Sequence, residues 1–192
     1  MRKIIVFCVV LFSGLVSLSA QEGIQVNEKA PGFVANDQHG NRVDLAKELE
    51  AHSVVLVFYR GQWCPYCNRH MSALQDSLQM ITDKGARVIA ITPEKNEEIE
   101  KTIDKSNASF SVIYDEGHQI MDAYDVTFTM SKTKFTAYKT YGIDINKASG
   151  NTDRALPVPA TYIIGKDGYV SNRHFDKNYK TRMSVKDILR SL

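Results

Sequence analysis

The pattern of hydrophobic and polar residues along the chain predicts strands that alternate with helices. Three near-continuous apolar runs, at residues 54–59, 87–92 and 160–164, are typical of strands that are covered on both faces of a sheet. After the first run, residues suited to burial recur at spacings of four and three, namely Cys67, Met71, Leu74, Leu78 and Ile81. This period predicts a helix that runs to about residue 84, with Gly85 as its C-cap.

The remaining pattern adds shorter elements around this framework. We expect a hairpin over residues 33–45, helices at 46–51, 95–104 and 118–124, a strand at 110–114, a return strand at 169–175 and a closing helix at 184–192. The polar stretch 126–156 is interpreted as an insertion near the turn after the first strand, with a weak helix at 134–141; a surface excursion without a role is the open alternative. The order of elements predicts an α/β fold, with a central mixed β-sheet, helices on both faces and an N-terminal hairpin extension.

The first twenty residues have the composition of a secretory signal peptide. Arg2 and Lys3 give a charged start, residues 4–18 form an apolar run, and residues 17–20 are mostly small. The run is short for a stable membrane anchor. We therefore predict a signal peptide at residues 1–20, a single domain at residues 21–192, and an exported protein that is periplasmic or extracellular.

Removing the predicted leader changes the charge and the cysteine count. Cys8, Arg2 and Lys3 leave with it, so that 22 basic residues remain against 22 acidic ones. A net charge near zero argues against nucleic acid or an anionic membrane as a partner. Cys64 and Cys67 are then the two remaining cysteines, in a compartment that permits disulfides.

These two cysteines follow the first buried strand at the point where the helix is expected to begin. Helix N-terminal amides and the positive end of the helix dipole lower the pKa of a thiol at that position. Pro65 suits the first helical position. Helical spacing turns Cys67 toward the core, so we expect Cys67 to be shielded and Cys64 to be exposed at the tip. One accessible thiol beside one shielded thiol is the arrangement of a dithiol/disulfide couple.

Other interpretations of the Cys-x-x-Cys spacing remain open. It also fits a structural disulfide, half of a zinc site or two core cysteines. A zinc site would need further ligands, such as His70. A structural bridge that closes so short a loop would stabilise the fold little. The location at a strand-to-helix turn favours redox chemistry over all three.

Four stretches of the chain together carry a family resemblance. They are Ala30-Pro31-Gly32-Phe33, the turn Phe58-Tyr59-Arg60-Gly61-Gln62-Trp63-Cys64-Pro65-Tyr66-Cys67, the late strand Val158-Pro159-Ala160-Thr161-Tyr162-Ile163-Ile164-Gly165-Lys166-Asp167-Gly168, and the tail His174-Phe175-Asp176-Lys177-Asn178-Tyr179. Together with the element order, this set resembles the thioredoxin fold, and within it the peroxiredoxin-like branch of the AhpC/TSA family. The Cys-Pro-Tyr-Cys sequence is also similar to that of thioredoxins and glutaredoxins. The fold implies that Pro159 faces the two cysteines through a cis peptide bond.

The chain departs from the usual peroxiredoxin turn, which reads Pro-x-x-x-Thr-x-x-Cys and is completed by an arginine on the late strand. Arg60 stands at the proline position and Cys64 at the threonine position. Cys67 stands at the peroxide-attacking position, and Pro159 falls where the late arginine is expected. Arg60 could supply a charge for a thiolate or a peroxide, or it could cap nearby carbonyl groups as a loop arginine.

We therefore predict an exported thiol-dependent oxidoreductase that uses Cys64 and Cys67 as catalytic residues and Pro159, Arg60 and Trp63 to position the substrate. Thiol–disulfide exchange is the preferred reaction, with a thiol electron donor of the thioredoxin type as partner and no cofactor. One alternative is a thiol peroxidase that reduces hydrogen peroxide or alkyl hydroperoxides. A second alternative is a copper-binding module without enzymatic activity, in which His70 or His174 joins the cysteines.

Overall fold

The computed structural model describes residues 21–192, so the predicted signal peptide lies outside the described range. These residues fold around one five-stranded sheet with helices, and the predicted α/β fold with a central sheet is confirmed. Within this range, no helix combines the length and the apolar character that crossing a membrane requires.

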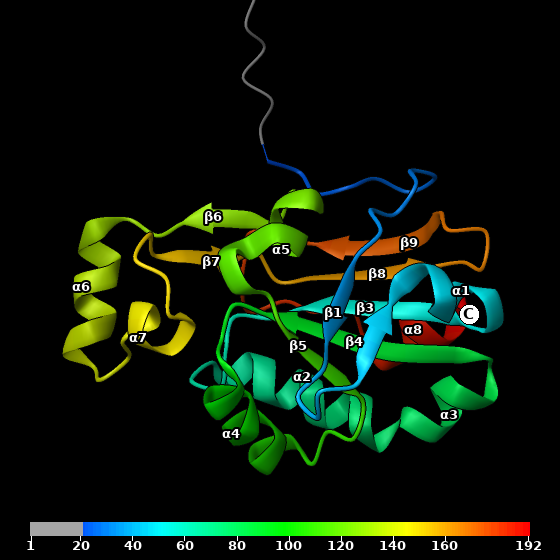
Figure 1. The fold of residues 1–192 in the computed structure, drawn as a ribbon, viewed down its shortest axis with the longest axis horizontal. Coiled ribbons are helices and arrows are strands. Elements are labelled where there is room, and N and C mark those ends of the chain that lie inside the picture. The colour runs from blue at the N-terminus through cyan, green and yellow to red at the C-terminus, as the bar shows by residue number, and fades with distance from the viewer. Residues whose placement is uncertain (1–20) are drawn as a thin grey trace, which may run out of the picture.

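The central sheet has the strand order β5-β4-β3-β8-β9 (Figure 1). At its centre, β3 (Ser53–Phe58) pairs in parallel with β4 (Ala86–Thr92), which pairs in parallel with β5 (Ser111–Tyr114). On its other side, β3 pairs antiparallel with β8 (Ala160–Ile164), and β8 pairs antiparallel with β9 (Val170–Phe175). The sheet is mixed, as predicted, and the carboxyl ends of the three parallel strands lie at one edge.

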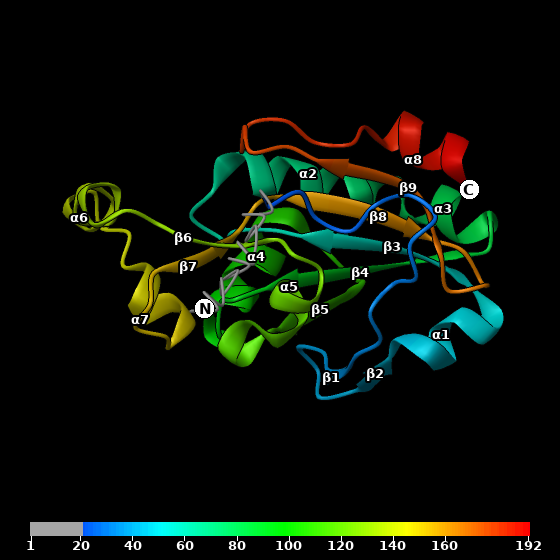
Figure 2. The same cartoon turned by 90° about the horizontal axis from the view of Figure 1, so that it is seen from above.

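Side chains of β3 alternate between two hydrophobic cores, one on each face of the sheet. Val55 and Val57 belong to the first core, and Leu56 and Phe58 belong to the second. The first core is covered by α2 (Pro65–Asp76), α3 (Leu78–Asp83), α4 (Asn96–Ser106) and α8 (Val185–Ser191). The second is covered by α1 (Leu45–Ala51) and α5 (Gln119–Ala123), the latter preceded by the 3-10 turn η1 (Glu116–His118). In Figure 2, α2 and α8 lie on one side of the sheet and α1 lies on the opposite side.

The predicted N-terminal hairpin is confirmed. β1 (Val34–Asn36) pairs antiparallel with β2 (Arg42–Asp44). Asp44 then caps α1, because its carboxylate accepts a hydrogen bond from the amide of Ala46 at 3.2 Å. The hairpin and α1 therefore form one continuous cover over the second core.

The helix that was expected to run unbroken to about residue 84 is divided in two, so that expectation is wrong. Ser77 leaves the helical conformation (φ −108°, ψ 7°) between α2 and α3. Aspartate and serine at positions 76 and 77 are poor residues for a helix interior, which gives a physical reason for the break. Gly85 follows α3 with φ 77°, as expected of a residue that ends a helix.

The insertion at residues 126–156 has an ordered structure of its own. β6 (Thr127–Thr129) pairs antiparallel with β7 (Ala155–Pro157), and between them lie α6 (Lys132–Thr140) and α7 (Ile145–Ser149). The predicted weak helix is thus confirmed as α6. Figures 1 and 2 both show α6 at one end of the molecule, joined to the central sheet through β6 and β7.

Candidate active site

The two cysteines lie on the turn that joins β3 to α2. Cys64 is the N-cap residue of α2, with extended backbone angles (φ −91°, ψ 107°), and Pro65 is the first helical residue. The amides of Cys67 and Asn68 donate to the carbonyl oxygen of Cys64 at 3.0 and 3.1 Å. Both thiols are free and lie within one helical turn of each other, which is the spacing of a pair that can form a disulfide.

The surroundings of the two thiols move their pKa values in opposite directions. The pKa of Cys64 is lowered to about 6, chiefly by a hydrogen bond from the Cys67 thiol and further by the Cys67 amide, Arg182 and Arg60. The pKa of Cys67 is raised well above its ordinary value, chiefly by burial and next by the adjacent Cys64 sulfur. The two shifts therefore favour the thiolate on Cys64 and the proton on Cys67, where the Cys67 thiol can donate a hydrogen bond to the sulfur of Cys64.

The expectation that Cys64 is exposed is wrong. The exposed fraction is 2% for Cys64 and 1% for Cys67. Aromatic side chains from distant parts of the chain cover the start of α2, including Tyr138 of α6 and Tyr179 after β9. These side chains line an open cavity of about 230 Å³ that Cys64 also lines and Cys67 does not. Cys64 is therefore the thiol that a molecule in this cavity would meet first.

The expected cis peptide bond at Pro159 is also wrong, since no peptide bond within residues 21–192 is cis. Pro159 lies in the short link between β7 and β8, and the Val158 amide donates to the carbonyl oxygen of Val126 at 2.7 Å. Both flanking strands are paired, so a trans bond keeps the chain extended from one to the other. Pro159 lines a cavity with Arg60 and does not line the cavity of Cys64.

Arg60 and Trp63 lie on the same turn as the cysteines. Arg60 is buried, with an exposed fraction of 3%, and its guanidinium lies 5.1 Å from the centre of the Trp63 ring. Trp63 lines the Cys64 cavity and packs edge-on against Tyr138, with 5.4 Å between the ring centres. The structure therefore brings Arg60, Trp63 and both cysteines together, and the insertion contributes a side chain to their surroundings.

Sequence reasoning missed Arg182, which contacts the more buried cysteine. Its Nη2 atom donates to the sulfur of Cys67 at 3.1 Å. Arg182 lies in the irregular segment between β9 and α8, where no periodic pattern marks its direction. Only the tertiary fold brings it to the start of α2.

Sequence reasoning also missed Glu94, a carboxyl group that is 2% exposed. Its Oε2 atom accepts a hydrogen bond from the Gln62 amide at 2.7 Å, and its Oε1 atom has no hydrogen-bond partner within the described residues. Burial raises the pKa of this carboxyl to about 8. The position of Glu94 in the sequence could have indicated its place in the site. Glu94 follows β4 as the cysteine turn follows β3, and the carboxyl ends of adjacent parallel strands meet at one edge of a sheet.

The surroundings of the cysteines do not form a metal site in the described part of the chain. His70 is buried on α2, and burial lowers its pKa to about 4. Across residues 21–192, no group of three or more His, Cys, Asp or Glu side chains is arranged to hold a metal ion. Among these residues, the copper-binding alternative therefore lacks a third His, Cys, Asp or Glu ligand beside the two cysteines.

Comparison with known proteins relates the chain to two kinds of thiol enzyme. A model of the AhpC/TSA family matches residues 26–173. Thiol-disulfide oxidoreductase ResA of Bacillus cereus is 23% identical over 175 residues, which cover 91% of this chain and 82% of that protein. Peroxiredoxin Bcp of Bacillus subtilis is 28% identical over 103 residues, which cover 54% of this chain and 65% of that protein.

A solved structure agrees with the fold. The crystal structure of peroxidoxin BcpB from Mycobacterium tuberculosis has a TM-score of 0.67 to this chain, covering 88% of it and 96% of the solved chain. The sequence identity is 14%, so this likeness bears on the fold alone.

Proposed function

The chain belongs to the AhpC/TSA family, and we therefore propose that it carries out thiol–disulfide exchange through Cys64 and Cys67. The chain is an oxidoreductase of the thioredoxin fold. The proposal of thiol–disulfide exchange rests on the opposite pKa shifts of the two cysteines. This reaction needs one thiolate that attacks the substrate and a second thiol that resolves the mixed disulfide.

The proposed reaction has two steps. The Cys64 thiolate attacks one sulfur of the substrate disulfide, a mixed disulfide forms, and the other substrate sulfur leaves as a thiolate. Cys67 then loses its proton and attacks the Cys64 sulfur, which forms the Cys64–Cys67 disulfide and releases the second substrate thiolate. The substrate gains two electrons and the protein loses two, so a thiol donor of the thioredoxin type must reduce the protein again.

Peroxide reduction is the second candidate function. Arg182 favours it, because this guanidinium contacts Cys67, the cysteine at the peroxide-attacking position of the family. In that reaction one thiolate is oxidised to a sulfenic acid, and the other cysteine condenses with it to form the same disulfide with loss of water.

Serine substitutions test the assignment of the two cysteines. Cys67→Ser is expected to accumulate a stable mixed disulfide with a small disulfide substrate, because the resolving thiol is gone. Cys64→Ser, the matched control, is expected to form none, because the remaining Cys67 thiol does not line the cavity of Cys64 and burial raises its pKa. Mass spectrometry of the intact protein measures the adduct. A mixed disulfide on Cys67 in place of Cys64 would reverse the roles and favour the peroxidase.

We also propose that the protein is exported, as the charged and apolar pattern of residues 1–20 indicates. Mass spectrometry of the protein from its native host is expected to find a mature chain that begins near Gln21. Arg2→Glu combined with Lys3→Glu removes the charged start and is expected to leave the precursor unprocessed. Recovery of the wild-type protein with residues 1–20 still attached would contradict export by this route.

A further inference from the structure

Arg60 is enclosed by aromatic rings and has no acidic partner among the described residues. Its guanidinium lies 4.9 Å from the ring centre of Tyr179, 5.8 Å from that of Tyr138 and 6.0 Å from that of Phe128, besides its contact with Trp63. None of the ion pairs within residues 21–192 involves Arg60. A buried guanidinium is costly unless a negative charge or several acceptors compensate it. The Cys64 thiolate attracts Arg60 electrostatically but is not among its hydrogen-bond partners within the described residues.

The hydrogen-bond donors of Arg60 are largely unused. The guanidinium has five N–H donors. One long hydrogen bond, of 3.4 Å, runs from its Nη2 atom to the hydroxyl of Tyr138. Its Nε atom is buried and has no partner within the described residues. The aromatic rings stabilise the cation through their faces, but they accept none of these N–H groups in the plane of the guanidinium.

Arg60 lines a cavity of about 440 Å³, which is within the size range of pockets for small molecules. Two lysines, Lys134 and Lys177, also line it, and no acidic residue does. Apolar side chains form much of the remaining wall, namely Phe128, Met130, Val158 and Pro159. The cavity thus combines three positive groups with an apolar wall, which suits an organic anion better than a bare inorganic one.

This cavity lies next to the cavity of Cys64. Tyr138 and Tyr179 line both of them. A molecule that presents a sulfur to Cys64 could therefore extend past these two rings toward Arg60. The second cavity is placed to hold the part of a substrate that does not react.

We propose that the Arg60 cavity binds a carboxylate attached to an apolar group, so that the preferred substrate is a small disulfide that carries a carboxylate. The planar guanidinium matches a carboxylate through two parallel hydrogen bonds. Lys134 and Lys177 add a screened, longer-range attraction. The assignment of the substrate class rests on the proposed disulfide exchange, whereas the carboxylate site itself does not need the thiols.

Binding can be measured without any thiol chemistry, because Trp63 is the single tryptophan of the chain and lies against Arg60. Titration with 3-phenylpropionate is expected to change the tryptophan fluorescence and to saturate. The neutral 3-phenylpropionamide is expected to bind about tenfold more weakly, because it lacks the charge that strengthens the hydrogen bonds of Arg60. Calorimetry checks both affinities independently.

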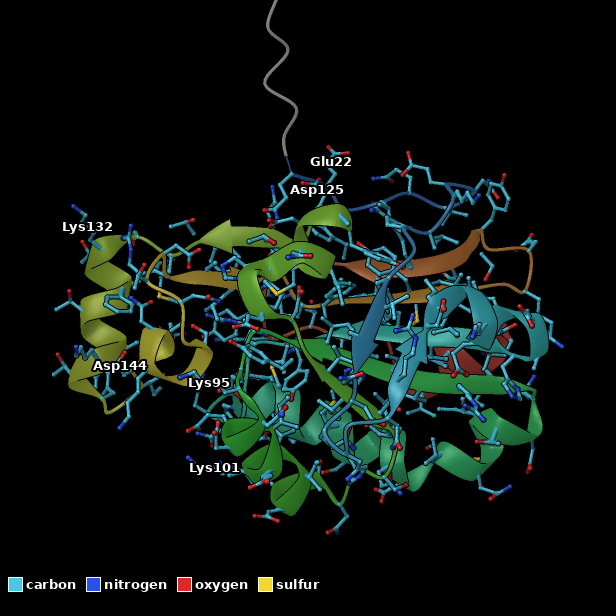
Figure 3. The ribbon with its side chains drawn as sticks, in the orientation of Figure 1. Glu22, Lys95, Lys101, Asp125, Lys132 and Asp144 are labelled. Atoms are coloured by element: carbon cyan, nitrogen blue, oxygen red, sulfur yellow. The ribbon has the colours of Figure 1, made fainter. Side chains whose placement is uncertain are left out.

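Variants test which residues hold the anion. Arg60→Met is expected to remove the preference for the acid over the amide, and Lys134→Gln is expected to weaken acid binding about twofold to threefold at low salt. Lys132→Gln is the matched control, because Lys132 lies on the same helix, does not line the cavity and points away from the molecule in Figure 3. Its affinity for the acid is expected to equal that of the wild type. If Arg60→Met does not fold, Lys134→Gln and Lys132→Gln still test the proposal, because Lys134 and Lys132 are exposed and replacing them is not expected to affect folding.

Three results would overturn the proposal. They are equal affinity for the acid and the amide, an undiminished preference for the acid in folded Arg60→Met, and competition by inorganic phosphate as strong as that by 3-phenylpropionate. Exchange with the neutral bis(2-hydroxyethyl) disulfide, measured on the same protein, tests the proposed disulfide exchange separately from the carboxylate site. Failure of that exchange would contradict the proposed function and leave the carboxylate site standing.

Discussion

Hydrogen peroxide is expected to oxidise the reduced protein on the order of 10²–10³ times more slowly than it oxidises a peroxiredoxin with the usual set of donors. Cleavage of the O–O bond needs a thiolate and also donors that stabilise the charge developing on the leaving oxygen. At the two positions where the family resemblance implies a threonine and an arginine, this chain has Cys64 and Pro159. A thiol is a weak donor, and proline has neither an amide N–H nor a polar side chain.

Two guanidinium groups near the cysteines can recover part of the lost rate of oxidation by peroxide. Arg182 contacts the sulfur of Cys67, and Arg60 lowers the pKa of Cys64. Arg60→Met is therefore expected to reduce the remaining oxidation by peroxide more than it reduces exchange with a neutral disulfide. Arg69→Met is the matched control, because Arg69 is exposed on α2 and stacks on Tyr66.

Stopped-flow mixing of the reduced protein with hydrogen peroxide measures the rate through the fluorescence of Trp63. A neutral small disulfide gives the comparison under the same conditions. A peroxide rate equal to that of dedicated peroxidases would mean that the scaffold and Arg182 determine the chemistry. Peroxide reduction would then replace disulfide exchange as the proposed function.

The sequence predicts the central strand, the turn and the start of the following helix well, because local patterns determine all three. The apolar run of β3, Pro65 at the first helical position and the spacing from Cys67 to Leu74 each point to the same local structure. The parallel pairing of β3 and β4 follows from the helical connection between them. These features rest on contacts within a few residues or on general rules of connection.

The burial of Cys64 could not be predicted in the same way. The side chains around it include Tyr138 and Tyr179, which are 74 and 115 residues away along the chain, line the same cavity and pack against Trp63 and Tyr66. The contact of Arg182 with Cys67 has the same origin. A helical period shows which side of α2 faces the sheet, but it carries no information about which distant side chains cover the tip.

Pro159 shows a different kind of failure. Its expected cis bond came from the resemblance of the fold, not from any property of the residues around it. In this chain β7 precedes Pro159 and is paired with β6, so the approach to β8 is made by an extended strand. The insertion that provides β6 and β7 thus leads directly into the late strand β8.

Replacing Glu94 with glutamine is expected to remove a marked loss of stability that develops as the pH rises from about 5 to about 8. The folded protein raises the pKa of this carboxyl to about 8, mainly because burial disfavours its charge. In the unfolded chain a glutamate has a pKa of about 4.3. Between these two values the folded state keeps a proton that the unfolded state has lost, so the free energy of unfolding falls as the pH rises.

The size of the effect follows from the two pKa values. Each pH unit between them costs about 1.4 kcal/mol, so the wild type is expected to lose about 3–4 kcal/mol relative to Glu94→Gln between about pH 5 and about pH 9. The loss levels off above the folded pKa, where both states are ionised. Urea unfolding at a series of pH values, in a Cys64→Ser/Cys67→Ser background that removes the titration of both thiols, measures this difference.

Glu97→Gln is the control for a general change of charge, because Glu97 is exposed at the start of α4, three residues from Glu94. It is expected to keep the pH dependence of the wild type. A Glu94→Gln curve parallel to that of the wild type would mean that the carboxyl ionises in the folded state at its ordinary pKa.

Because a Cβ atom on Gly61 would collide with this carboxyl, Gly61 and Glu94 form a direct contact between the cysteine turn and the loop after β4. Ionisation of Glu94 in the folded state is therefore expected to disturb the turn that holds Cys64 and Cys67.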